Sequence, residues 1–324
     1  MLLAYLSAVM ASTSNHFIRQ LPSHKIIGKN FIDLKKRGYY FSGIDSVFVY
    51  MANLSKNDEL LMVKVMAKEV QTSNLKGPEG LVLYSDSYIS FDQNNIFLFE
   101  GIKSEVWSGA KATLKLSKLV KTPNFAKGIP LSSTTFLFRC IDNYRQNVLV
   151  KLQTSGKIKT VTGLLKKQID GLFCTDGQLI KVPNSNKVFY TYYYRNQFVC
   201  ADTNLNLIYR GKTIDTNSYA KIKIAKISSK NQLTLAAPPV YVNKHSCAND
   251  KYLFIHSGLK SDNETDRMHN DAAAIDVYNV SDGKYRWSFY LPDFDGKKLT
   301  DFRVYGQSLY AIYDHYLYKY QLNF

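Results

Sequence analysis

The fold is decided by the end of the chain. Residues 302–320 read FRVYGQSLYAIYDHYLYKY, three short runs rich in Tyr, Phe, Val, Leu and Ile. Gly306-Gln307 and Asp314-His315 separate these runs. Aromatic and β-branched residues favour strands, whereas Gly and Asp between them favour tight turns. The stretch therefore predicts three consecutive β-strands joined by short turns.

Five similar groups precede this one. Each contains strand-like runs separated by Asn, Asp, Gly or Ser. The groups begin with Tyr39–Phe41, Leu81–Tyr84, Thr135–Phe138, Leu172–Cys174 and Tyr252–Ile255. They recur at about 40 to 60 residues, which is the spacing of propeller blades. The pattern predicts an all-β fold, a single β-propeller, for which about 50 residues per blade gives six blades and leaves seven open.

The final group has only three strands, one fewer than its blade needs. A strand near Ile26–Leu34 is the candidate for the fourth, because its pairing would seal the ring and cover a free sheet edge. No low-complexity linker divides the chain, so residues 24–324 are predicted to be one propeller domain. Within this domain, Lys103–Val120 fits a strand, a loop or a short helix.

The chain is aromatic and basic. Its 324 residues include 24 Tyr and 18 Phe and carry a formal net charge of +16. The excess is concentrated in residues 101–170, which contain thirteen Lys and Arg but three acids. Such a region can dock an anionic polymer, or it can be a solvated surface that keeps strand edges apart. The lysines lack the interleaved aromatic residues that stack on bases, so the pattern favours the solvated surface and disfavours nucleic acid.

The N-terminus resembles an export signal. Leu2–Ala11 reads LLAYLSAVMA and is followed by the polar residues Ser12–Asn15. This apolar run is too short to span a bilayer, which needs about 20 residues. It fits the apolar region of a signal peptide with a small-residue cleavage site at Ala8–Ala11, although a positively charged start is missing. Residues 1–23 are therefore predicted to be a signal peptide or membrane-anchor remnant and a linker. A buried N-terminal helix is the alternative.

Familiar catalytic and cofactor motifs are absent from the sequence. It contains no GxSxG, GxxxxGK[ST], GxGxxG or HExxH pattern. The four cysteines form no CxxC pair and are predicted to act as small hydrophobic residues, with disulfides left open. Asp262–Asp266 suggests calcium, but Arg267 stands where an EF-hand loop needs Gly. We therefore assign no metal site, cofactor or catalytic residue.

The best candidate for a binding region is the turn within Tyr192–Gln197, which reads YYYRNQ. An arginine beside aromatic rings and an amide can bind a carboxylate, a phosphate or a sugar. The alternative is a plain hairpin turn whose tyrosines pack between blades. The candidate ligand-binding residues are Tyr194, Arg195 and Asn196, together with Asp170 and Asp215.

Five stretches resemble a group of known proteins. They are Phe17–Pro22, Gln168–Gly171, Tyr192–Phe198, Thr213–Thr216 and Ala274–Tyr278. They resemble an uncharacterised family of bacterial envelope proteins that is similar to the TolB-like and NHL-like six-bladed propellers. The resemblance implies the propeller fold and an N-terminal export signal or membrane anchor, and it supplies no catalytic residue.

Three functions remain open at this point. The leading hypothesis is a non-enzymatic binding or scaffold protein of the cell envelope, periplasmic or membrane-anchored, with an unknown protein or carbohydrate partner. A cytoplasmic location is left open. The second hypothesis is a hydrolase or lyase for a sugar or lactone, which needs carboxylates or a carboxylate and a histidine in the channel. Its available acids are Asp170, Asp202, Asp215 and Asp276. The third is binding of an anionic polymer through residues 101–170.

Overall fold

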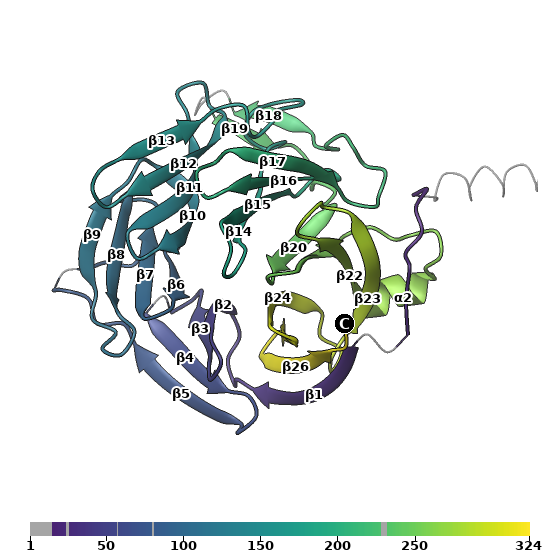
Figure 1. The fold of residues 1–324 in the computed structure, drawn as a ribbon, viewed down its shortest axis with the longest axis horizontal. Helices are drawn as coiled ribbons and strands as arrows, with labels where there is room; N and C mark the ends of the chain where they lie inside the picture. The colour runs from purple at the N-terminus through teal and green to yellow at the C-terminus, as the bar shows by residue number, and fades with distance from the viewer. Residues whose placement is uncertain (1–14, 24–25, 57, 80, 228–231) are drawn as a thin grey trace, which may run out of the picture.

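The computed structural model describes residues 15–23, 26–56, 58–79, 81–227 and 232–324. Within these ranges, six four-stranded antiparallel sheets stand around a central axis as the blades of a propeller (Figure 1). The prediction of an all-β protein with six blades is confirmed.

Consecutive strands pair within each of the first five blades. Blade 1 consists of β2 (Tyr39–Ile44), β3 (Val49–Asn53), β4 (Glu59–Lys64) and β5 (Glu69–Asn74). Blade 2 consists of β6 (Tyr88–Asp92), β7 (Asn95–Glu100), β8 (Glu105–Ala110) and β9 (Ser117–Lys121). Blade 3 consists of β10 (Phe125–Ser132), β11 (Thr135–Ile141), β12 (Asn147–Gln153) and β13 (Ile158–Val161). Blade 4 consists of β14 (Gly177–Lys181), β15 (Lys187–Tyr192), β16 (Gln197–Asp202) and β17 (Leu207–Lys212). Blade 5 consists of β20 (Asn243–Ala248), β21 (Tyr252–Ser257), β22 (Ala272–Asn279) and β23 (Tyr285–Pro292).

Blade 6 combines the two ends of the chain. It consists of β24 (Leu299–Tyr305), β25 (Ser308–Tyr313), β26 (Tyr316–Leu322) and the N-terminal β1 (Ile26–Asp33). β1 pairs antiparallel with β26, so that Ile26 lies opposite Leu322 and Asp33 opposite Tyr316. Backbone hydrogen bonds between the two ends of the chain therefore close the ring, and the predicted closing strand is confirmed.

The burial of a strand depends on its place in the blade. Every residue of the second strands β3 and β21 is buried, whereas no residue of the outermost strand β5 is. The second strands are covered on both faces by neighbouring blades, which explains their continuous apolar runs. The cores lie between blades, and Phe254, Phe289 and Phe302 belong to the one between blades 5 and 6.

Two of the predicted strands are wrong. Leu81–Tyr84 and Leu172–Cys174 are loops, and β14 and β20 are innermost strands that the sequence pattern does not predict. These strands border the central channel and contain Gly, Gln, Lys, His and Ser, so they lack the apolar runs of the middle strands. Lys103–Val120 contains β8 and most of β9.

Two elements lie outside the blades. The hairpin of β18 (Ile224–Ile227) and β19 (Gln232–Leu235) follows blade 4, and the short helix α2 (Asp266–Asp271) connects β21 to β22. The four cysteines are buried free thiols. Among the residues that the structure describes, no helix has the length and apolar character needed to cross a membrane. Residues 1–14 of the predicted leader lie outside the described residues.

Candidate functional site: a cavity between blades 5 and 6

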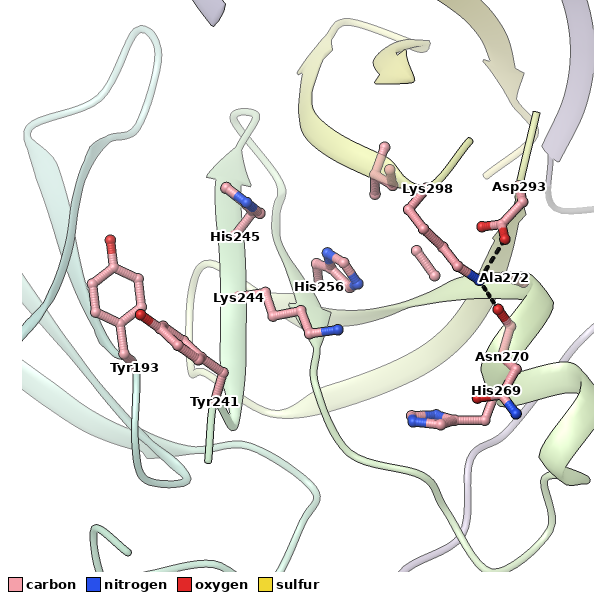
Figure 2. A pocket seen from close by; sticks show the side chains of 12 residues that line it. Tyr193, Tyr241, Lys244, His245, His256, His269, Asn270, Ala272, Asp293 and Lys298 are labelled. Atoms are coloured by element: carbon pink, nitrogen blue, oxygen red, sulfur yellow. Dashed lines mark hydrogen bonds and ion pairs between the residues drawn. The ribbon is translucent and has the colours of Figure 1, made fainter. Parts of the chain in front are cut away.

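A cavity of about 620 Å³ opens where blades 5 and 6 meet (Figure 2). Its wall comes from the start of β20, the end of β21, the helix α2, the start of β22 and the start of β24. We call the face of the ring on which β20 and β24 begin the upper face. The lining residues are Tyr193, Tyr241, Lys244, His245, His256, His269, Asn270, Ala272, Ala273, Asp293, Lys298 and Leu299.

Basic side chains dominate the polar part of this wall. Among the described lining residues, Asp293 is the one acid, and its carboxylate lies 2.6 Å from the Lys298 ammonium. The Lys298 ammonium also donates to the carbonyl of Asn270 (Figure 2). Burial, and then the charge of Lys298, lowers the pKa of Lys244. An anion in the cavity would oppose this shift, because it would supply the counter-charge that Lys244 lacks.

Two of the three histidines face each other across a hairpin. The register of β20 and β21 places His245 opposite His256, with ring centroids 6.2 Å apart and planes at 20°. Burial, followed by the charge of Lys244, holds the pKa of His256 well below its usual range. Burial also lowers the pKa of His245 and of His269. All three imidazoles are therefore neutral at neutral pH and can both donate and accept hydrogen bonds.

His256 keeps an unused polar atom inside the protein. The residue is 6% exposed, and its Nδ1 is a buried atom without a hydrogen-bond partner in the described structure. Buried polar groups are nearly always paired, so such an atom marks a place where a ligand or a water would bind.

Two tyrosines form the opposite wall. The rings of Tyr193 and Tyr241 meet edge to face with centroids 5.7 Å apart. Tyr241 is 43% exposed, so part of its ring is open to a ligand. Figure 2 shows both hydroxyls on the side of the cavity away from Lys298. The cavity therefore has a flat aromatic side and a basic side.

The predicted residues Tyr194, Arg195 and Asn196 lie immediately behind this aromatic wall. With Tyr193 they form the turn between β15 and β16, and they are 4%, 1% and 5% exposed. The Arg195 guanidinium stacks 3.7 Å from the ring centroid of Tyr192 and donates to the carbonyl of Lys166 at 2.6 Å.

A side chain of blade 5 fixes this turn in place. The Asn243 amide donates to the carbonyls of Tyr192, at 2.7 Å, and of Arg195, at 3.0 Å. The turn therefore supports Tyr193, which lines the cavity, while the three predicted side chains are themselves buried. Their direct binding of a ligand stays a prediction.

The two predicted acids lie apart from the cavity. The Asp170 carboxylate accepts the backbone N–H groups of Leu172, at 2.6 Å, and Phe173, at 2.5 Å, and so fixes a loop. Asp215 accepts the hydroxyl of Thr213 at 2.5 Å, and burial raises its pKa. Neither belongs to the cavity wall. The turn brings Asn196 to Asp215, since the amide donates to the Asp215 carbonyl at 2.6 Å.

The other two acids considered for catalysis also have structural partners. Asp202 accepts the backbone N–H of Asn204 at 2.8 Å at the turn that follows β16. Asp276 binds the guanidinium of Arg19 at 2.8 Å. Of the four acids, none lines the cavity.

Sequence reasoning missed the residues that do line it. Lys244, His245 and His256 belong to the β20–β21 hairpin, whose first strand has no apolar run. The useful signal was the turn at Asn249-Asp250: folding the chain back there places His245 opposite His256.

The basic region 101–170 spans two blades. Several of its cations have local partners: Lys118 pairs with Glu105, Lys111 with Asp45 at 2.8 Å, and Arg139 with Asp176. Lys127 and Lys118 lie at opposite edges of their blades, on the innermost β10 and the outermost β9. The region is therefore distributed over several surfaces.

Comparisons with known proteins identify the fold. No family model matches the sequence, and no curated protein matches it. A member of the DUF4221 family from Bacteroides vulgatus is similar at a TM-score of 0.55 and 12% identity, over 93% of this chain and 99% of that one. Virginiamycin B lyase from Staphylococcus aureus is similar at a TM-score of 0.50 and 10% identity, over 92% of this chain and 99% of that one. These likenesses show a shared β-propeller fold and no more.

Proposed function

We propose that this protein is a non-enzymatic binding protein of the bacterial cell envelope, and that it binds an anionic, ring-containing ligand such as an acidic saccharide. One observation carries the proposal. Two lysines, three histidines and two tyrosines converge on one cavity whose only acid, among the described lining residues, is already paired with a lysine.

The chemistry of the wall matches each part of such a ligand. A carboxylate or sulfate would pair with Lys244, whose ammonium has no ion pair or hydrogen bond among the described contacts. Such a charge-assisted hydrogen bond is stronger than one between neutral groups. The neutral imidazoles can bind hydroxyl groups as donors and acceptors. The partly open ring of Tyr241 offers a flat apolar face. The volume of about 620 Å³ is typical of a small-molecule site.

Calorimetric titration with digalacturonate and with its neutral counterpart, digalactose, tests the proposal. Digalacturonate should bind more tightly than digalactose. Lys244→Ala should lower the affinity for digalacturonate about tenfold, the loss expected for one charge-assisted hydrogen bond. Lys251→Ala is the matched control, because Lys251 lies in the turn between β20 and β21, away from the cavity wall. Equal affinity for the two sugars, or equal effects of the two substitutions, would contradict the proposal.

The envelope location rests on the apolar run Leu2–Ala11 and on the sequence resemblance. Fractionation of the natively expressed, C-terminally tagged protein tests it: the protein should be recovered with periplasmic or membrane material. Recovery with the cytosol would overturn the location and leave the cavity's ligand to be judged by titration.

A second candidate function is a lyase reaction on an acidic sugar. Neutral His256, with its unpartnered Nδ1, would accept the proton from the carbon beside the carboxylate, and Lys244 would neutralise that carboxylate. As the C=C bond forms, the glycosidic C–O bond on the next carbon would break, and the leaving oxygen would take a proton from water. The similar structure from Staphylococcus aureus is of a lyase described as catalytically inactive after a histidine was replaced by alanine. Incubation with oligogalacturonate should then produce an ultraviolet-absorbing unsaturated sugar, and its absence would remove this candidate.

A further inference from the structure

The N-terminal segment Asn15–Gln20, here called the strap, packs against blade 5 beside α2 (Figure 1). Phe17 and Arg19 are buried, whereas Ile18 is 67% exposed. This alternation is that of an extended strand with one face buried. The Gln20 carbonyl accepts the N–H of Ser288 in β23 at 2.8 Å, so the strap begins to pair with the edge of the blade.

The buried face of the strap is held by charge. Arg19 is 2% exposed, and its Nε lies 2.8 Å from Asp276. The same guanidinium contacts the Glu264 carboxylate and donates to the Leu259 carbonyl at 3.1 Å. Without Arg19, two buried carboxylates would lose their counter-ion, so the acids and the arginine form one unit.

The strap also holds the loop that leads into α2. The Phe17 carbonyl accepts the N–H of Asp262 at 2.9 Å. The Arg19 backbone N–H donates to the Asn263 side-chain oxygen at 3.0 Å, and the Asn263 side-chain amide donates to the Arg19 carbonyl at 2.9 Å. Phe17 packs with Leu259 and with Val242, the residue before β20.

This loop continues directly into the cavity wall. Thr265 caps α2, and the helix then presents His269 and Asn270 to the cavity (Figure 2). No residue of α2 itself is buried. The helix therefore has little packing of its own. The loop that the strap binds holds its first end, whereas Lys298, which donates to the Asn270 carbonyl, and the Asp293 N–H, which donates to the Asp271 carbonyl at 2.9 Å, hold its last end.

We propose that the strap is a latch that helps to set the position of the α2 side of the cavity, so that docking of the strap and binding of an anionic ligand strengthen each other. This inference rests on the proposed function for its ligand. Coupling of this kind is reciprocal. Release of the strap must weaken binding of the ligand, and binding of the ligand must protect the strap from hydrogen exchange.

The test uses the full-length chain and three readouts. Arg19→Ala should accelerate hydrogen exchange in residues 258–271 and leave exchange in β11 unchanged. It should also lower the affinity for digalacturonate at least fivefold. Binding of digalacturonate to the wild type should in turn slow exchange in residues 15–20. Nuclear magnetic resonance of the His269 ring should report a changed environment in the variant even without ligand.

A further variant keeps the test decisive if Arg19→Ala unfolds the chain, and a control accompanies it. Arg19→Met with Glu264→Gln and Asp276→Asn removes the charged unit as a whole and should still release the strap. Arg37→Ala is the matched control, because Arg37 also pairs with an acid, Asp314, at 3.0 Å, but is 73% exposed in its side chain. It should change none of the three readouts.

The outcomes separate the two proposals. Unchanged hydrogen exchange and an unchanged His269 signal after removal of the charged unit would overturn the latch. Faster exchange with unchanged affinity would overturn the coupling and leave the ligand site standing. If the wild type does not bind digalacturonate, the proposed ligand fails, and the latch is then decided by exchange and by the His269 signal.

Discussion

Arg19 and Arg195 are two buried arginines with different surroundings. Arg19 is 2% exposed and contacts two carboxylates, Glu264 and Asp276. Arg195 is 1% exposed and has an aromatic ring and one carbonyl instead. Its Nε and Nη1 have no hydrogen-bond partner within the described structure. The two residues have similar burial, but only Arg19 has ionised partners among the described residues.

The difference teaches that burial alone does not indicate what a charged residue does. Arg19 joins elements that are 245 and 257 residues apart in the chain, and its acids depend on it. Arg195 supports a local turn, and no carboxylate of the described residues pairs with it. Removing the first should expose an electrostatic cost, whereas removing the second should mainly cost packing and hydrogen bonds.

Arg19→Ala should have the largest effect. Loss of one partner from a buried charged group typically costs about 3–5 kcal/mol, because the remaining charge stays buried without compensation. The free energy of unfolding from urea titration should fall by that amount relative to the wild type. The variant with all three charges removed should recover only the part of the loss that comes from the two uncompensated carboxylates, because its strap is still released. A cost below about 1 kcal/mol would mean that the strap is not docked in solution.

Arg195→Met should have a smaller effect. Methionine can fill the space against Tyr192, so the loss reduces to one hydrogen bond and one cation–π contact, about 1–2 kcal/mol. The same urea titration measures it. A loss as large as that of Arg19→Ala would break the comparison, since it would show that Arg195 has an anionic partner in solution.

Much of the fold follows from local patterns in the sequence. The second strand of each blade is buried between neighbours, and its apolar run is visible without a structure. The count of strands in the final group also predicts the N-terminal closing strand. The innermost strands β14 and β20 escape this reading, because they border the channel and contain polar residues, whereas the innermost β2 and β24 contain runs that the sequence pattern predicts.

The site was less accessible to sequence reasoning, because its parts come from separate elements. The turn at Tyr194–Asn196 was recognised from its composition, yet it supports the wall from behind. His245 and His256 meet only through the register of a hairpin whose first strand is polar. The contact between Arg19 and Glu264 needs the strap to lie on blade 5, which no local pattern indicates.

The pH dependence of stability should give the smallest effect and sharpen the comparison further. Burial and nearby positive charges, including that of Arg19, hold the pKa of His256 well below its usual range. In the unfolded chain, its pKa is about 6.5. The unfolded state therefore binds a proton that the folded state does not bind, so the free energy of unfolding falls as the pH drops below about 6.5 and is retained above it.

His256→Phe should reduce this loss of unfolding free energy between pH 6.5 and 5 by about 1 kcal/mol, measured by urea titration at each pH. Arg195→Met should leave the slope unchanged, because its turn lies behind the aromatic wall on blade 4. An unchanged slope in His256→Phe would show that other groups on the upper face control the acid sensitivity.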